Sequence, residues 1–230
     1  MVNIINIKDR IDGDLWFSEV VKELNSANSD FEDLRKLIES VSPTLDGWCA
    51  KEKAIYLIAV ILSKKPKVVV EIGVFGGSSF IPMALALNLI GTGEIYGIDP
   101  WSSSSSSEGM EGENLEWWSS LDHEQIYKRF LQSLNRYGLG DAAWINLCRM
   151  TSTQAIGKFS EIDVLHIDGN HSVEQSLFDA QRYCPLVSRN GIIIFDDYQQ
   201  FYTQAASDWM DKHYQVLFDI DTSRFYRPKG

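Results

Sequence analysis

The chain has 230 residues, of which 44% are apolar, and this is enough for one α/β domain with a buried core. Its formal net charge of −11 argues against nucleic acid as a partner, because phosphate binding depends on Lys and Arg. The three cysteines are widely separated and form no C-x-x-C pair, which argues against a disulfide framework or a zinc site. We therefore expect a protein that acts on a small-molecule acceptor.

The sequence shows no sign of membrane attachment. Its longest apolar run, residues 54–62, is far shorter than the roughly 18 residues that a spanning helix needs. Residues 1–10 lack the basic and then apolar layout of a signal peptide. We expect no membrane partner and, by default, a cytoplasmic location.

The first part of the chain, residues 1–65, is expected to be a helical extension of the same domain. Helices are predicted over residues 15–28, 30–40 and 51–64, and apolar residues recur at helical spacing in the second of them. These amphipathic helices could cap an active site or form the contact surface of a homo-oligomer.

Strands and helices then alternate over residues 66–230, which predicts a mostly parallel sheet with right-handed crossovers. The last two strands are joined by only three residues, so they must form an antiparallel hairpin. No internal repeat or second domain is visible. The expected strands are 68–71, 94–98, 142–147, 162–168, 191–196, 214–220 and 224–227, and the expected helices are 79–90, 123–137, 153–158, 173–186 and 201–213.

A glycine-rich turn follows the first of these strands. The strand is rich in β-branched residues and ends in Glu71, and Gly73 and Gly77 then allow a tight turn and close approach of a ligand. The next helix is expected to begin near Ser78 or Ser79, because Pro82 is tolerated only in a first turn. Its free N–H groups and dipole would face an anionic group of a ligand.

The glycine spacing does not fit the G-x-G-x-x-G fingerprint of dinucleotide-binding proteins. It resembles the E/D-x-G-x-x-x-G motif of class I S-adenosylmethionine (SAM) methyltransferases, with Glu71, Gly73 and Gly77 in register. An ordinary strand-to-helix turn of an α/β protein is the alternative. The next strand ends in Asp99, an acid suited to hold ribose hydroxyls, and this favours SAM.

A polar segment follows Trp101. It contains six consecutive serines, residues 102–107, and then residues 108–114, and it cannot bury enough apolar surface to stay ordered by itself. It is either a disordered surface insertion or a lid, residues 101–116, that orders when ligand binds. In the second case Trp101, Trp117 and Trp118 would form aromatic walls, although they could equally be core residues.

Acids end two later strands. Asp168 ends one strand, and Asp196 and Asp197 end the next. If the strands are neighbours, these carboxylates lie close together and repel unless a cation such as Mg²⁺, Ca²⁺ or Mn²⁺ neutralises them. Adjacent residues of a strand point to opposite faces, so Asp196 and Asp197 can both be ligands only if the strand ends there. Otherwise one of them caps the following turn or helix.

Residues 47–225 resemble the metal-dependent O-methyltransferases of the class I fold, most strongly over residues 70–79, 166–172 and 191–198. The nearest branch contains macrolide and aminocoumarin sugar O-methyltransferases. The resemblance implies a Rossmann-like fold: a seven-stranded, mostly parallel sheet with an antiparallel last strand and helices on both faces. It also implies a metal on Asp168, Asp196 and Asp197, with Asp in place of the Asn of catechol-type relatives.

The resemblance places His171 at the position of the catalytic Lys of catechol-type relatives, so His171 is expected to be the catalytic base. Capping of the following helix is its alternative role. His166 is expected to be a buried core histidine. The residues expected to contact SAM are Glu71, Gly73, Phe75, Gly77, Ser78, Ser79, Asp99, Trp101, Thr151, Ser152 and Asp168.

Three functions stay open at this stage. The first is Mg²⁺-dependent methyl transfer from SAM to a hydroxyl of a natural-product or sugar-like acceptor. The second is metal-independent methyl transfer to nitrogen or carbon, and the third is SAM binding without turnover.

Overall fold

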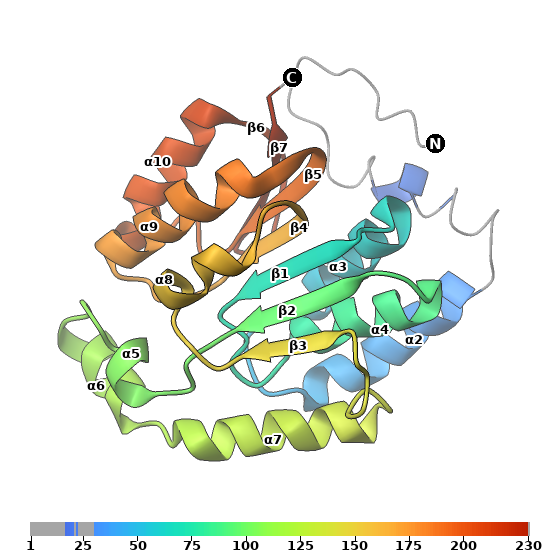
Figure 1. The fold of residues 1–230 in the computed structure, drawn as a ribbon, viewed down its shortest axis with the longest axis horizontal. Helices are drawn as coiled ribbons and strands as arrows, with labels where there is room; N and C mark the ends of the chain where they lie inside the picture. Colours follow the sequence, from blue (N-terminus) through green and yellow to red (C-terminus); the bar gives the residue numbers. More distant parts are fainter. Residues whose placement is uncertain (1–16, 21, 23–29, 230) are drawn as a thin grey trace.

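The computed structural model describes residues 17–20, 22 and 30–229, so most of the helix predicted over residues 15–28 lies outside the described residues. The described chain forms a seven-stranded sheet with the order β3-β2-β1-β4-β5-β7-β6 (Figure 1). β7 is antiparallel to both of its neighbours, β5 and β6, and the other strand pairs are parallel. The strands are β1 Val68–Ile72, β2 Glu94–Ile98, β3 Ile145–Cys148, β4 Ile162–Ile167, β5 Val187–Phe195, β6 Tyr214–Ile220 and β7 Ser223–Pro228.

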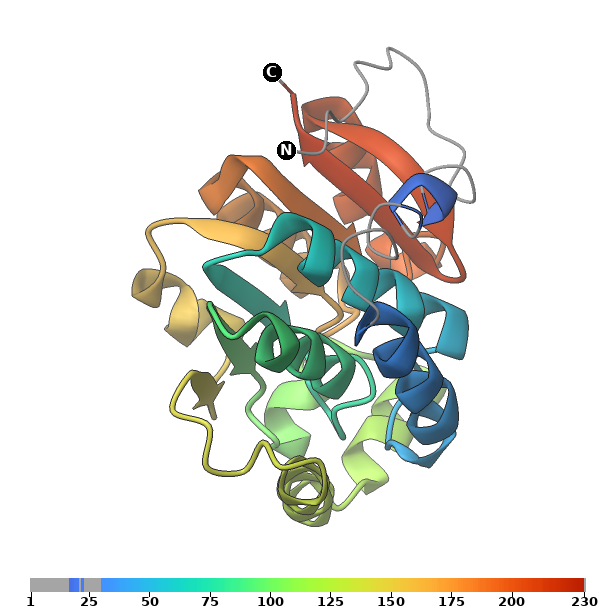
Figure 2. The same cartoon turned by 90° about the vertical axis from the view of Figure 1, so that its right-hand side faces the viewer.

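Helices cover both faces of the sheet. α2, α3 and α4 lie on one face, α8, α9 and α10 lie on the other, and α7 runs beside β3 (Figure 1). Figure 2 shows the β6–β7 hairpin, in red, at the end of the sheet away from α7. The α-helices are α2 Asp30–Val41, α3 Lys51–Lys64, α4 Phe80–Ile90, α5 Ser103–Ser106, α6 Gly112–Ser120, α7 His123–Arg136, α8 Ser152–Ala155, α9 Val173–Tyr183 and α10 Gln204–His213, and the 3₁₀ turns are η1 Ser42–Thr44, η2 Ile156–Lys158, η3 Cys184–Leu186 and η4 Phe201–Thr203. None of the described helices is long and apolar enough to cross a membrane.

The sheet separates two apolar cores. Successive residues of a strand point to opposite faces, so Val69 packs with α3 and α4 while Val70 packs with α9 and α10. The central strands are apolar on both faces because both faces are covered. The predicted fold class is confirmed.

The largest differences from the expected elements have local causes. β3 begins at Ile145 rather than at residue 142, because the N–H and C=O groups of Ala142 are used in turns with Leu139 and Ile145. The helix expected over residues 173–186 ends as η3, since Pro185 has no N–H to continue it. The serine run is not irregular, because α5 lies within it and α6 follows it.

Candidate functional site

A cavity of about 500 Å³ lies at the carboxyl ends of β1, β2 and β4. Ligands of open α/β sheets bind at this edge, where the helix crossovers leave a crevice. Six of the residues predicted to contact a cofactor line the cavity, namely Gly73, Phe75, Asp99, Thr151, Ser152 and Asp168.

Gly73 closes the bottom of the cavity. Its φ of +88° and its position both require glycine, because a Cβ would lie 1.9 Å from the carbonyl oxygen of Asp168. The turn after β1 therefore lies directly against the loop after β4. Gly77 has a different role, since a Cβ there would meet the ring of Phe130 at 2.5 Å.

Asp99 organises one wall of the cavity. Its carboxylate accepts hydrogen bonds from the backbone N–H groups of Phe75 (2.8 Å) and Trp101 (2.7 Å). Burial raises the pKa of Asp99, and these two N–H groups oppose that rise. Asp99 thus fixes the rim and still faces the cavity.

The lid hypothesis made Trp101 an aromatic wall of the cavity, but the structure shows the alternative, a core residue. Its side chain is buried against Phe130, and its indole N–H donates to the carbonyl oxygen of Phe75 at 2.8 Å. It supports Phe75 from behind. Trp118 lines the cavity, and Trp48, which we had not predicted, packs against Phe75 and is 64% exposed.

The serine-rich segment forms the roof of the cavity. Asn170, in the loop after β4, donates to the carbonyl oxygens of Ser105, Ser106 and Glu108 at 2.9–3.4 Å, and all three acceptors line the cavity. Asn170 also accepts from the N–H of Ser172. That the roof opens and closes remains a prediction. The sequence analysis did not predict the role of Asn170, whose side chain binds the roof to the loop after β4.

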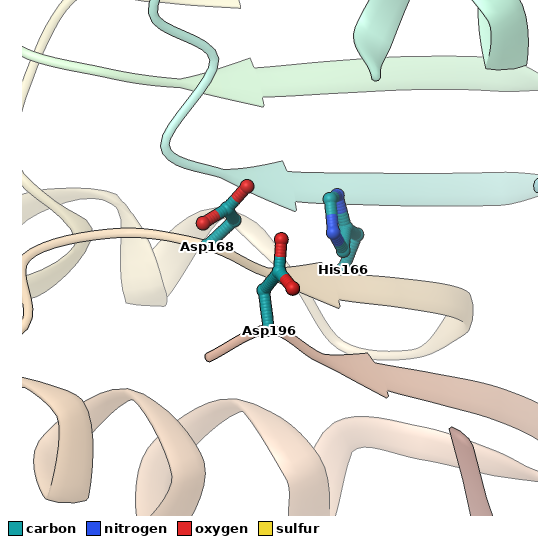
Figure 3. A group of neighbouring side chains, drawn as sticks. All are labelled: His166, Asp168 and Asp196. Atoms are coloured by element: carbon teal, nitrogen blue, oxygen red, sulfur yellow. The ribbon is translucent and has the colours of Figure 1, made fainter. Parts of the chain in front are cut away.

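The acids of β4 and β5 meet beside the cavity (Figure 3). β4 and β5 are parallel neighbours, so Asp168 and Asp196, which follow their last residues, lie together. The potential metal-ligating atoms form two groups, one of His166, Asp168 and Asp196 and the other of Asp168, His171 and Asp197. Asp168 belongs to both groups.

The inner group is held by a lysine. Lys53 of α3 is completely buried, forms a very short ion pair with Asp196, and lies 3.8 Å from Asp168. The other oxygen of Asp196 accepts from the hydroxyls of Thr222 and Ser223. Burial alone would raise the pKa of Asp196, but Lys53 outweighs this effect and holds the pKa well below its usual range.

The outer group is more open. The Nε2 atom of His171 lies 3.2 Å from Asp197 and 3.9 Å from Asp168, and the three side chains are 18–28% exposed. Burial, together with repulsion from Asp196, raises the pKa of Asp168 to about 6. Burial would lower the pKa of His171, but the neighbouring aspartates raise it above its ordinary value.

Asp197 faces away from Asp196 because the strand has ended. β5 stops at Phe195, and Asp197 adopts a left-handed conformation with φ of +51°. This uncommon conformation for a non-glycine residue turns its carboxylate toward His171. The two adjacent aspartates therefore belong to different groups.

A hard divalent cation fits the outer group. Asp168 and Asp197 supply oxygen ligands, and the repulsion that raises the pKa of Asp168 would be relieved by bound positive charge. Asp196 fits less well as a direct ligand, because its oxygens already accept from Lys53, Thr222 and Ser223.

Glu71 lies under the glycine turn and not in the cavity. It accepts a very short hydrogen bond from Ser79, and its Oε1 atom lies 2.8 Å from Nδ1 of His166. Both side chains are fully buried, so His166 is a core histidine as expected. Five residues that were predicted to contact a cofactor do not line the cavity. One is the buried Trp101, and the other four lie in or under the glycine turn: Glu71, Gly77, Ser78 and Ser79.

Comparison with known proteins identifies a matching family. A family model described as a methyltransferase domain matches residues 70–198. A curated relative, the uncharacterized protein R132 of Acanthamoeba polyphaga mimivirus, is 26% identical over 156 residues, which are 68% of this chain and 62% of that protein. A second, the uncharacterized protein y4gI of Sinorhizobium fredii, is 27% identical over 58% of this chain and 13% of its own length. The chain thus spans less than two thirds of either relative.

Solved structures share the fold. The S-adenosylhomocysteine (SAH)-bound methyltransferase PaMTH1 of Podospora anserina has a TM-score of 0.56 at 14% identity, covering 97% of this chain and all of that one. The O-methyltransferase NovP has a TM-score of 0.61 at 16% identity, covering 78% and 79% of the two chains. TomG of Streptomyces achromogenes, an O-methyltransferase of tomaymycin synthesis solved with SAM, has a TM-score of 0.57 at 12% identity and covers 88% and 91%.

Proposed function

The chain belongs to this family of methyltransferase domains, and from that premise we propose that it transfers a methyl group from SAM to a hydroxyl of a small molecule, assisted by a divalent cation such as Mg²⁺. One observation carries the proposal: Asp168, His171 and Asp197 converge beside a cavity that Gly73 and Asp99 also line. The site thus combines a cofactor cavity with a cation-binding acid pair and a base.

The cofactor would lie across the carboxyl ends of β1 and β2. Its methionine carboxylate would lie at the glycine turn that precedes α4, where Gly73 lines the cavity and permits close approach to the backbone. Its ribose hydroxyls would lie at Asp99, and its adenine near Thr151 and Ser152 at the start of α8. Asp168, which lines this cavity and belongs to the acid cluster, would lie beside the reacting end of the cofactor.

The reaction is a direct displacement. The acceptor hydroxyl loses its proton to His171, its oxygen forms a bond to the methyl carbon, and the bond between that carbon and sulfur breaks. SAH leaves with the electron pair of the broken bond. His171 lies 3.2 Å from Asp197, so the aspartate orients the imidazole and stabilises it once protonated.

Asp168 and Asp197 would hold the cation, and Asp196 would add negative charge from behind while Lys53 fixes its position. When bound, a divalent cation lowers the pKa of the acceptor hydroxyl and orients its oxygen. Its charge would also offset the aspartates that raise the pKa of His171. A small hydroxylated acceptor suits the site, because Phe75 and Trp118 line the cavity and offer apolar faces.

The proposal is tested by measuring SAH release across a panel of hydroxylated acceptors, with Mg²⁺ or with EDTA. We expect release that requires both an acceptor and the metal, and that is lost in Asp168→Ala. Release unaffected by EDTA would favour transfer to nitrogen or carbon without a metal. Binding of SAM with no release for any acceptor would favour a binding protein. A cytoplasmic location and an oligomer through the N-terminal helices stay predictions.

A further inference from the structure

A buried acid that the mechanism does not use, Asp179, belongs to α9, on the other face of the sheet from Lys53. Asp179 is completely buried and lines the cavity together with Ser152 and Gln175. Charged side chains are almost never fully buried unless they are paired. In the described part of the chain no cation pairs with Asp179, so its position calls for an explanation.

The three side chains form a closed hydrogen-bonded triangle. The Ser152 hydroxyl donates to Oδ1 of Asp179 at 2.6 Å, and the Gln175 amide nitrogen donates to the same oxygen at 2.8 Å. The same amide nitrogen donates to the Ser152 hydroxyl oxygen at 2.9 Å. Tyr183 fixes the backbone here, because its hydroxyl donates to the carbonyl oxygen of Ser152.

Counting donors shows what this triangle offers to a ligand. Ser152 has one hydroxyl hydrogen and Gln175 has two amide hydrogens, and the triangle uses all three. Burial raises the pKa of Asp179 to about 7, so above that pH its carboxylate is ionised, only accepts hydrogen bonds, and turns the hydrogens of both neighbours toward itself. What Ser152 and Asp179 have left to offer is acceptor capacity alone.

One acceptor in particular lacks a partner. The Oδ2 atom of Asp179 has no hydrogen-bond partner among the described residues. It faces Gly169, where a Cβ would come within 3.4 Å of it, and Gly169 also lines the cavity. An unsatisfied buried acceptor is costly, and a ligand that brings a donor to this wall would offset the cost.

We propose that Asp179 is a positioning residue that, through Ser152 and Gln175, makes this wall of the cavity selective for a base with an exocyclic amine. The inference rests on the proposed function, which places adenine near Thr151 and Ser152. The adenine amine donates hydrogen bonds, whereas hypoxanthine has a carbonyl oxygen in its place. Against a wall that only accepts, the carbonyl finds no donor and leaves both sides unpaired.

The test compares two cofactor products, SAH and S-inosylhomocysteine, which differ in that amine, by calorimetry at a pH above the pKa of Asp179. We expect the wild-type protein to bind SAH more tightly by about tenfold or more. In Asp179→Asn the amide oxygen would face Ser152 and Gln175, and an NH₂ group would replace Oδ2. The wall then donates, so the ratio of the two dissociation constants is expected to fall by about tenfold or more.

Two further variants keep the test decisive. Ser152→Ala removes one acceptor of the wall, so it should also lower the selectivity for SAH over S-inosylhomocysteine. It replaces Asp179→Asn in the test if that variant does not fold. Asp163→Asn is the matched control, because Asp163 holds the N–H groups of Lys67 and Val68 at the opposite end of β4. Its ratio should equal that of the wild type.

An unchanged ratio in folded Asp179→Asn, or in Ser152→Ala where the first variant does not fold, would overturn the inference. Failure of the wild-type protein to bind SAH would instead overturn the cofactor assignment. Because the readout is a ratio of affinities, a general loss of stability does not imitate the expected result.

Discussion

Asp196 and Asp179 are both buried beside the same cavity, the first in contact with α3 and the second on α9, yet they have opposite environments. Asp196 has Lys53 packed against it and accepts from two hydroxyls. Among the described residues, the hydrogen-bond donors to Asp179 are the neutral side chains of Ser152 and Gln175. The pKa of Asp196 is lowered, whereas burial raises that of Asp179 to about 7.

The difference shows that depth of burial does not decide the state of a carboxyl group. Both side chains are at most 5% exposed. A buried cation lowers the pKa of Asp196 and so favours its ionised form, while Asp179 can hold a proton near neutral pH. The first arrangement holds a fixed charge near the proposed metal site, whereas in the second the charge of Asp179 depends on pH.

The contrast between Asp196 and Asp179 is tested most directly by removing Lys53, the cation beside Asp196. Lys53→Met leaves the charges of Asp196 and Asp168 without their buried partner, and we expect a loss of about 3–5 kcal/mol in the free energy of unfolding. Urea unfolding measures it. Lys64→Met on the same helix is the control, because Lys64 donates to the carbonyl oxygen of Asn190 near the surface. Equal losses in the two variants would show that Lys53 is not the counterion.

The double variant Lys53→Met with Asp196→Asn sharpens this result. It removes both charges of the pair, so it should recover much of the lost stability. If the double variant is less stable than Lys53→Met, then the Asp196 carboxylate stabilises the fold through its hydrogen bonds even without Lys53, and its unpaired charge is not the main cost.

The second prediction concerns pH. Folded Asp179 has a pKa of about 7 against 3.8 as its ordinary value, so between these pH values the folded chain keeps a proton that the unfolded chain releases. The stability from neutral Asp179 is therefore complete below about pH 4 and is lost as pH rises through 7. Asp179→Asn lacks this loss and should gain on the wild type by at most about 4 kcal/mol near pH 8.

The difference between the two proteins is measured by urea unfolding from pH 5 to pH 8. Other titrating groups are common to both proteins and cancel in the difference. A difference between Asp179→Asn and the wild type that does not change with pH would mean that Asp179 is ionised throughout the range.

The third prediction separates Asp168 from Asp196 as ligands. Asp168 belongs to both groups of ligating atoms, whereas Lys53 and two hydroxyls already occupy Asp196. Asp196→Asn should weaken Mn²⁺ binding by about tenfold, the lower end for a supporting residue, and Asp168→Asn by more. Titration followed by electron paramagnetic resonance measures both. The reverse order would make Asp196 the principal ligand.

The smallest expected effect is that of Tyr183→Phe. The variant removes one hydroxyl that donates to the carbonyl oxygen of Ser152, which should cost about 1 kcal/mol in the free energy of unfolding. The selectivity for SAH over S-inosylhomocysteine should stay unchanged, because the triangle of side chains is intact. A collapse of selectivity here would assign base recognition to the backbone of Ser152.

The parts of the fold that depend on local pattern could be predicted. The turn after β1 needs Gly73 for its backbone conformation, and the short link before Ser223 could only be a hairpin. The acids at the ends of β4 and β5 were expected to meet, because parallel neighbours end at one edge of the sheet. Their division into two groups depends on the end of β5 at Phe195 and on the conformation of Asp197.

What could not be predicted depends on contacts between distant segments. Lys53 precedes an apolar run in α3, and nothing in that run shows that it is buried against residues more than 100 positions later. The burial of Asp179 could not be predicted for the same reason, since its partner Ser152 comes from another helix, α8. For Trp101 the sequence left two roles open, an aromatic wall or a core residue, and the hydrogen bond of its backbone N–H to Asp99 accompanies the second.

The reversed direction of β7 has a consequence for the order in which the protein is made. Because β7 is antiparallel to β5, its first residues, and not its last, meet the end of β5, and so Ser223 and its neighbour Thr222 reach Asp196. A ribosome adds these two residues more than 20 positions after the acid that they contact. During synthesis the cofactor cavity can therefore take shape first, and the acid cluster beside it is completed only when the final hairpin adds to the sheet.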